Sequence, residues 1–281
     1  MQYQITNTQY DEERALYAIR DTEVSGCVFA GPADGESALK ECTNVKVHNC
    51  KFSLRYPLWH AKNFLLSDSY MDALTRAPMW YTENGTIRHC RIEGIKAIRD
   101  CHDTLIEKSV ILSPEFGWKC RGLVMRDSAV ESEYLLLDSK DLEIRSIAMK
   151  GKYSFQYTEN LTIENSTLDT KDAFWHAKNV TVTDSVIKGE YLGWFSDGLT
   201  LINCHIAGTQ PLCYCKNLRL INCTTEGCDL AFEYSEVDAD IKGGILSVKN
   251  PLSGSIRAEQ IGEIVTEGSV MESHCTIEIT K

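Results

Sequence analysis

Three charged side chains recur at one fixed spacing in this sequence. Asp100, Lys119 and Asp138 follow one another at intervals of 19 residues. If each interval is one rung of a stacked structure, the two carboxylates lie two rungs, roughly 9–10 Å, apart and could act as acid and base around a water, as in an inverting glycoside hydrolase. Lys119 could neutralise a sugar carboxylate or act as the base of a polysaccharide lyase. We therefore take Asp100, Lys119 and Asp138 as candidate catalytic residues.

Residues that could bind a substrate stand beside this column. Arg99 is a second cation and could clamp a carboxylate through two hydrogen bonds. Rings at the same two repeat positions would form the walls of a cleft: His60, Trp80, Tyr81, Trp118, Tyr157 and His176. The competing interpretation is an Asp-Lys-Asp ladder that only balances charge on the surface of a sheet. The sequence leaves both interpretations open.

A repeat of about 19 residues must position these side chains. Its register is marked by residues that tolerate a left-handed backbone: Asp21, Asn44, Asn63, Asn84, Asp103, Gly122, Asp141, Asn160, Asn179, Gly198 and Asn217. After a first interval of 23 and one of 21, every interval is 19. A period in this range is typical of a solenoid, in which equivalent positions stack on one another.

The pattern within each repeat predicts strands rather than helices. Positions one and three after the anchor are mostly apolar, as in Val45 and Val47, and polar residues alternate with them. The sequence therefore predicts an all-β fold, a single-stranded right-handed parallel β-helix with roughly 11–13 coils. We expect one domain over residues 1–281, with an N-terminal cap at 1–20, regular coils at 21–236, and irregular coils and a closing strand at 237–281.

All five tryptophans stand four residues before an anchor. Strict alternation would turn them inward, as an internal aromatic stack. A corner or bulge between this position and the next would turn them outward, as a platform on which sugar rings could stack. The sequence does not decide between the two.

The twelve cysteines share their repeat positions with small residues. Cys50 and Cys90 stand where Ser69 and Ser109 stand in neighbouring coils. This exchange indicates small buried side chains rather than a disulfide framework, and it suits a reducing cytoplasm. No pair of Cys-x-x-Cys motifs is present, so we expect neither a metal nor another cofactor.

Several runs along the chain resemble a bacterial family of single-domain parallel β-helix proteins that carries only a label of unknown function. They include Tyr56-Pro57-Leu58-Trp59, Lys171-Asp172-Ala173-Phe174-Trp175 and Ala231-Phe232-Glu233-Tyr234-Ser235. The resemblance implies a pectin-lyase-like right-handed β-helix. It implies no catalytic residues.

The net charge of -11 and the lack of a basic tract disfavour a nucleic-acid partner, and no apolar run is long enough to cross a membrane. No signal peptide precedes the repeats, so we expect a cytoplasmic protein. Our first hypothesis is a protein that binds, or also cleaves, an oligosaccharide or sugar conjugate on an exposed sheet face. The second is a non-catalytic scaffold that docks a protein partner. The sequence does not show the oligomeric state.

Overall fold

The computed structural model describes residues 3–280. They fall into two compact units, divided between Glu143 and Ile144. Both units are parallel β-solenoids with about 19 residues per coil, and together they contain about 15 turns. This confirms the all-β parallel β-helix, with more coils than the 11–13 expected. The hand of the coil and the single domain over residues 1–281 stay predictions.

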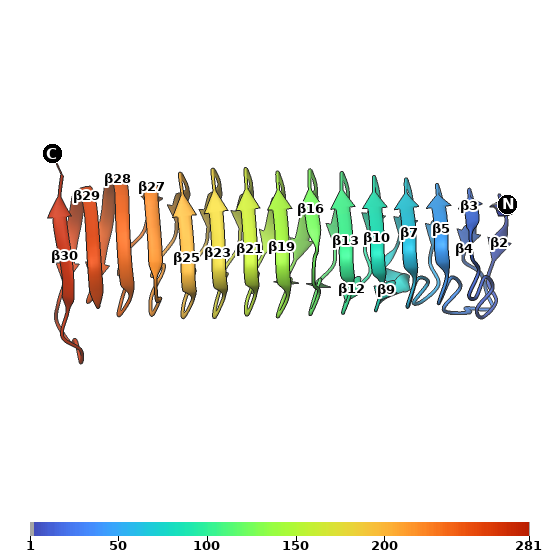
Figure 1. Ribbon diagram of the computed structural model, residues 1–281, viewed down its shortest axis with the longest axis horizontal. Coiled ribbons are helices and arrows are strands. Elements are labelled where there is room, and N and C mark those ends of the chain that lie inside the picture. The colour runs from blue at the N-terminus through green and yellow to red at the C-terminus, as the bar shows by residue number, and fades with distance from the viewer. Residues whose placement is uncertain (1–2, 281) are drawn as a thin grey trace. The chain divides into compact units, whose positions relative to one another are not determined.

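The first unit consists of short parallel strands stacked in columns. The longest column contains β1, β3, β5, β7, β10, β13 and β16, which lie side by side in Figure 1. The strands are β1 (Tyr3–Thr6), β2 (Gln9–Tyr10), β3 (Thr22–Ser25), β4 (Val28–Phe29), β5 (Thr43–His48), β6 (Lys51–Phe52), β7 (Lys62–Ser67), β8 (Tyr70–Met71), β9 (Met79–Trp80), β10 (Glu83–Arg88), β11 (Arg91–Ile92), β12 (Ile98–Arg99), β13 (His102–Glu107), β14 (Val110–Leu112), β15 (Glu115–Phe116), β16 (Val124–Arg126), β17 (Ala129–Ser132) and β18 (Tyr134–Leu135). β19 (Lys140–Arg145) contains the boundary between the units.

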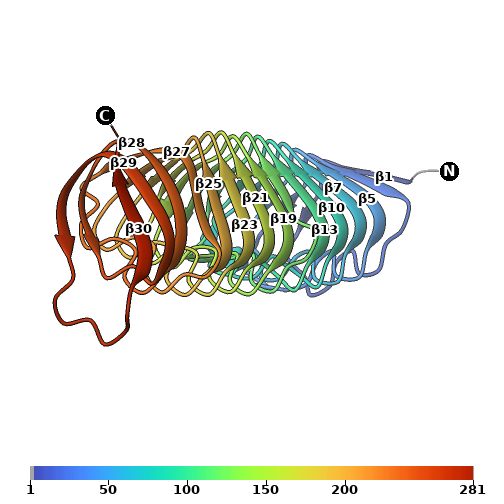
Figure 2. The ribbon, with the colours of Figure 1, turned by 60° about the vertical axis from the view of Figure 1, so that its left-hand side comes forward.

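The second unit repeats the same plan. β21, β23, β25, β27, β28, β29 and β30 form its long column. The strands are β20 (Ala148–Gly151), β21 (Glu159–Glu164), β22 (Thr167–Asp169), β23 (Lys178–Thr183), β24 (Val186–Lys188), β25 (Asp197–Ile202), β26 (His205–Ala207), β27 (Leu218–Glu226), β28 (Glu236–Lys249), β29 (Ser253–Val265) and β30 (His274–Ile279). Figure 2 shows successive turns of the chain closing around the interior of this unit.

Identical repeat positions stack with their apolar side chains inside. Leu66, Ile87, Ile106 and Met125 are register partners in successive coils, and each is fully buried. The sequence alternation is therefore the half-buried strand that it predicts. Burial of this column excludes water from one coil after another and supplies most of the driving force for stacking.

The anchor residues are left-handed positions near the start of the long strands. Asn63, Asn84 and Asp103 all have a left-handed backbone, with φ of 50°, 51° and 53°. Their side chains also join neighbouring coils, because the Asn84 amide donates to Asn63 Oδ1 at 2.8 Å and Asn63 donates to Asn44 Oδ1 at 3.1 Å. Asparagine at this position thus satisfies the turn and links the rungs.

The longer interval between Asn63 and Asn84 is absorbed outside the stacked strands. A 3-10 turn, η1 (Ala73–Thr75), stands between the short strand β8 and the strand β9. The Asp72 side chain caps it by accepting a hydrogen bond from the Leu74 N–H at 2.9 Å. The coil accommodates the extra residues there, and Leu66 and Ile87 still pair.

The cysteines are free, and all but Cys275 are buried. The main-chain N–H of Cys50 donates to the Ser69 hydroxyl at 3.0 Å, one coil further on. Burial raises the pKa of Cys50 to about 11 and that of Cys42 to about 12. The exchange of cysteine with serine in the sequence therefore corresponds to one stacked, buried column.

Paired strands lie near both ends of residues 3–280. Residues 1–20, expected as a cap, include β1 and β2, which pair with β3 and β4. The register shifts at two places, between Leu220 and Cys223, before the expected boundary at residue 236, and between Ile241 and Gly244, after it. The expected closing strand is β30, which pairs in parallel with β29.

Candidate functional site

A corner places the tryptophans on the outside of the coil. The residues three before each anchor, including Tyr81, Asp100 and Lys119, have φ of 59°, 51° and 55°. On β9, Met79 is buried and points inward, whereas the next residue, Trp80, is half-buried on the outer side. Tyr81, which follows, has a left-handed backbone that interrupts the strand alternation, so the indole of Trp80 stays on the outer side. The tryptophans therefore lie on the outside of the coil and do not form an internal aromatic stack.

Each indole is fixed by one hydrogen bond to the following coil. Trp80 Nε1 donates to the Lys96 carbonyl at 2.7 Å, and Trp118 Nε1 donates to the Tyr134 carbonyl at 3.1 Å. Trp59 and Trp80 also stack with ring centroids 5.4 Å apart. Their facing surfaces are covered by each other, so this pair does not offer two free ring faces to a sugar.

Arg99 lies between two of these indoles. Its guanidinium carbon is 5.1 Å from the centroid of Trp80 and 4.6 Å from that of Trp118. β12 pairs with β9 so that Arg99 is the register partner of Trp80, and a bridge joins Arg99 to Trp118. Both faces of the cation are thus covered by aromatic rings. Within residues 3–280 its N–H groups have no carboxylate or carbonyl partner.

The Asp-Lys-Asp column is stacked as predicted, on one edge of the first unit. The Asp100 N–H donates to the Trp118 carbonyl at 2.9 Å, and the Lys119 N–H donates to the Leu137 carbonyl at 2.9 Å. Among the described residues, the side chains of Asp100, Lys119 and Asp138 take part in neither an ion pair nor a hydrogen bond. The three charged groups therefore stack without direct ion pairs, and their role, in catalysis or in charge balance on the sheet, stays a prediction.

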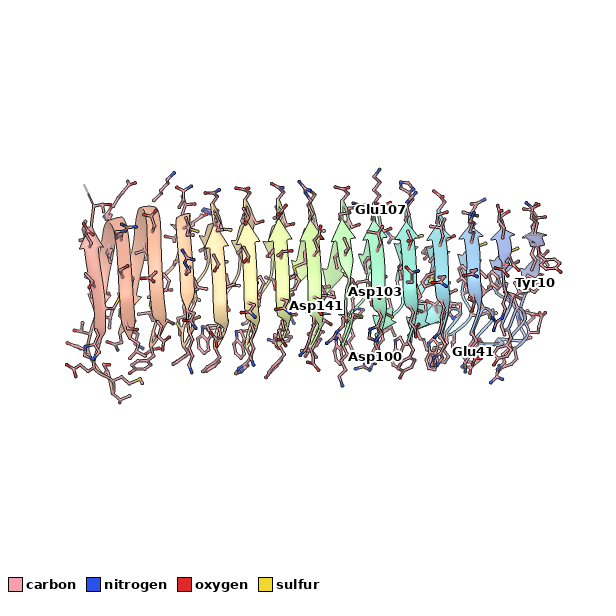
Figure 3. All side chains as sticks on the ribbon, viewed as in Figure 1. Tyr10, Glu41, Asp100, Asp103, Glu107 and Asp141 are labelled. Carbon is pink, nitrogen blue, oxygen red and sulfur yellow. The ribbon has the colours of Figure 1, made fainter. Side chains whose placement is uncertain are left out.

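Figure 3 shows where this edge lies on the long strands. Glu41 and Asp100, both three residues before an anchor, lie along the lower edge, whereas the anchor Asp103 lies on the strand face. Glu107 lies toward the upper ends of the strands. The candidate site is therefore at the edge where the chain enters the long strands.

The structure places the other candidates in two separate groups. His60 and Tyr81 belong to the first unit and stack with centroids 5.0 Å apart. Tyr157 and His176 belong to the second unit and stack at 4.9 Å. Arg99, Trp80 and Trp118 are brought together with Asp100 and Lys119 within the first unit.

The second unit extends its pair into a longer aromatic ladder. His176 stacks on Phe195 at 5.0 Å, and Phe195 stacks on Tyr214 at 4.9 Å. Tyr157 and Phe195 are 52% and 44% exposed. Phe195 and Tyr214 stand at the same repeat position as Tyr157 and His176, but they are not among the candidates that the sequence predicts. The interval of 19 residues from His176 to Phe195, and again from Phe195 to Tyr214, was the signal that could have identified them.

A groove on another corner of the first unit was also missed. Its volume is about 530 Å³, and a similar groove of about 440 Å³ lies in the second unit. Both grooves follow the left-handed residue five after the anchor. In the first unit the charged lining residues of the groove are Lys51, Asp68, Arg91 and Lys108, and His89 also lines it. Its residues are far apart in the sequence and carry no motif, so only the stacking of coils reveals it.

The described residues contain no cluster of three or more His, Cys, Asp or Glu side chains suited to hold a metal ion. Over the same residues, no helix is long and apolar enough to span a membrane.

Comparisons with known proteins identify a family and similar folds. A family model described as "Protein of unknown function (DUF3737)" matches residues 3–279. No curated protein matches the chain. Among solved structures, the surface adhesin PfbA of Streptococcus pneumoniae is 7% identical with a TM-score of 0.46, covering 98% of this chain and 91% of that one.

Two further structures are similar at the same level. The tailspike protein of E. coli bacteriophage HK620, solved with a hexasaccharide, is 8% identical with a TM-score of 0.43, covering 92% and 59% of the two chains. The A-module of the mannuronan C-5 epimerase AlgE4 of Azotobacter vinelandii is 13% identical with a TM-score of 0.30, covering 98% and 88%. At these values the similarities carry no functional argument.

Proposed function

The chain belongs to the DUF3737 family of proteins of unknown function, and we propose that this member binds an acidic oligosaccharide or sugar conjugate at Arg99. The observation that carries the proposal is the guanidinium held between Trp80 and Trp118 with no partner for its N–H groups. An arginine in one fixed plane loses little freedom when it binds a carboxylate through two parallel hydrogen bonds.

The neighbouring column supplies the other contacts that such a ligand needs. Lys119 is an exposed cation without an ion pair among the described residues, and it lies one coil beyond Asp100. Asp100 and Asp138 can accept hydrogen bonds from sugar hydroxyls because an ionised carboxylate is an acceptor only. Arg99 and Lys119 can bind an acid group, and the two carboxylates can bind hydroxyls. The site therefore suits a ligand that carries an acid group and hydroxyls.

Stacking of the coils repeats these contacts about every 4.8 Å along the solenoid. That period is comparable to the length of one sugar ring in a linear oligosaccharide, so successive rungs can contact successive rings. The proposal is one of binding. If the ligand is also cleaved, Asp100 and Asp138 act as the acid and the base. Formation of a product that disappears in an Asp100→Asn variant would establish cleavage.

The test is binding to an array of neutral and uronate-containing oligosaccharides, followed by calorimetry. We expect an acidic glycan to bind and Arg99→Lys to weaken it at least about tenfold, because lysine loses the planar fork and the double stacking. Lys119→Ala should weaken it less. Arg121→Ala is the matched control, since Arg121 is an exposed cation of the same coil that pairs with Asp141 at 3.6 Å. Equal affinity of Arg99→Lys and the wild type would refute the proposed site.

A protein-docking function is the second candidate, and the aromatic ladder of the second unit favours it. Tyr157, His176, Phe195 and Tyr214 cover one another's faces and expose mainly ring edges. Ring edges pack against apolar side chains, whereas a sugar needs a free face. Capture of a protein partner that is lost on Phe195→Ser, with glycan binding absent, would support this alternative.

A further inference from the structure

Strand β30 has hydrogen-bond partners along one edge. It pairs in parallel with Ser253–Ala258, the first part of β29, and its His274 N–H donates to the Leu252 carbonyl at 2.8 Å. Because main-chain groups alternate in direction along a strand, the groups on the other edge belong to Cys275, Ile277 and Ile279. No other strand within residues 3–280 pairs with β30. An open edge of this kind is a template for another strand.

The same three residues also begin a layer of core that is left uncovered. Ile277 is the register partner of Ile256, which is fully buried, but Ile277 is only half-buried itself. Ile279 is the partner of the fully buried Ala258 and is 57% exposed. The segment that leads into β30 projects from the end of the unit in Figure 2 and contains Val270, 88% exposed. A partner must therefore offer both a strand edge and apolar side chains.

The outer face of β30 is complementary to itself. If a second copy lies antiparallel across a twofold axis at Thr276, each His274 faces the second copy's Glu278, and the two Thr276 side chains face each other. In this register Cys275 and Ile277 exchange main-chain hydrogen bonds and keep their side chains toward the core. Polar pairs of opposite character and paired threonines are favourable directly opposite one another across a sheet.

The other end of the chain is a poorer match for this edge. The strands of the first coil, β1 and β2, have 4 and 2 residues, whereas β28 and β29 have 14 and 13. β30 itself has 6 residues, so a second copy of β30 matches the length of the open edge, whereas β1 and β2 are shorter. A symmetric contact also closes after two copies, whereas head-to-tail stacking would continue into a filament.

We infer that two copies of this chain pair through β30, antiparallel, with His274 of each copy opposite Glu278 of the other. The contact is independent of the proposed ligand site at Arg99. It predicts a species of twice the 31.7 kDa chain mass in sedimentation equilibrium.

A charge exchange tests the register. His274→Glu should raise the dissociation constant of the dimer at least about tenfold, because it sets two carboxylates opposite each other at two places. The double variant His274→Glu with Glu278→Lys should restore it to within about threefold. Both side chains are exposed and make no contact with each other in one copy, so a change in folding would not be reversed by the second substitution.

Proline substitutions separate the two ends of the chain. Cys275→Pro removes an N–H that points to the open edge of β30 and should give a monomer with an unchanged circular dichroism spectrum. Gln4→Pro does the same on β1, where the neighbouring Tyr3 N–H donates to the Asp21 carbonyl, and should leave the dimer intact. A monomeric wild type, a dimer that survives His274→Glu, or a dimer lost with Gln4→Pro would each overturn the inference.

Discussion

The left-handed residue three before each anchor decides what the candidate site can contain. The strain at this corner lies in the main chain, and each side chain projects outward. Residues as different as Asp100, Lys119 and Tyr81 therefore occupy equivalent positions. Each such residue costs about 1 kcal/mol or more relative to glycine. The solenoid tolerates this cost because the stacked coils on either side fix the backbone.

Asp138, with φ of 53°, allows this cost to be measured. Asp138→Gly should keep or slightly raise the free energy of unfolding, because glycine adopts this backbone without strain. Asp138→Val should lower it by about 1–2 kcal/mol, because a β-branched side chain disfavours the left-handed region. Urea denaturation of the two variants would show this order, and equal stabilities would contradict the account of the corner.

The indole hydrogen bonds provide a second residue-scale prediction. Trp194 Nε1 donates to the Gln210 carbonyl at 2.8 Å, and the ring stacks on Trp175 at 5.4 Å. Trp194→Phe keeps an aromatic ring but removes the donor, so we expect a loss of about 1 kcal/mol in thermal denaturation. Gln156 makes the equivalent bond to the Asp172 carbonyl at 2.9 Å, which indicates that the position needs the donor. No change in melting temperature would assign the stabilisation to the ring alone.

At this scale the sequence predicts one left-handed position and leaves a second one undecided. Asn, Asp and Gly at the anchors report the left-handed backbone because these residue types favour it. Tyr81 and Lys119 carry no such preference, so the sequence offers the corner that turns the tryptophans outward only as an alternative, and the structure decides for it.

Individual strands are joined across coils by more than their ladders. Glu107 of β13 accepts hydrogen bonds from Arg88 of β10 at 2.6 Å and from Arg126 of β16 at 2.8 Å. The Glu107 side chain is nearly buried, 11% exposed, and links three successive rungs at the end of the long strands. The positions of the strands were predictable from the alternation of apolar and polar residues. This link was not predictable, because the sequence pattern shows Arg88 and Arg126 only as outward-facing residues.

The link predicts a pH dependence of stability. The hydrogen bonds from Arg126 hold the pKa of Glu107 below its usual value of 4.5, although burial opposes them. Because the folded pKa is lower than the unfolded one, this stabilisation is complete above about pH 4.5 and is lost as pH falls through the folded pKa. Glu107→Gln should cost about 1–3 kcal/mol at pH 7. Urea denaturation between pH 7 and 3 should show the difference from wild type shrinking, and a constant difference would contradict the link.

The chain as a whole keeps its thiols in the interior. Eleven of its twelve cysteines are buried, and desolvation raises the pKa of the remaining Cys275 to about 11. Because the thiolate is the reactive form, we expect at most one slow reaction with Ellman's reagent at pH 7 and twelve fast reactions in guanidinium. A reductant should leave the melting temperature unchanged. Several fast native thiols would show that the coils open readily.

The whole architecture was predictable because one period of 19 residues runs through most of the sequence. The number of coils was not, since the first and last coils depart from that period, as the long strands β28 and β29 show. The clamp at Arg99 was predicted only as a nearby cation. Its position between Trp80 and Trp118 depends on the outward corner, which no residue type reports.

The 3-10 turn at Ala73–Thr75 has a consequence for how such a chain can change its length. The strands β7 and β10 on either side of it remain paired, so extra residues at this corner do not disturb the coils that follow. Gain or loss of a complete coil would likewise preserve every pairing. Genetic duplication can therefore lengthen this protein in whole coils, and short insertions can accumulate at the corner after β8. That corner is accordingly the place to graft a foreign peptide for display.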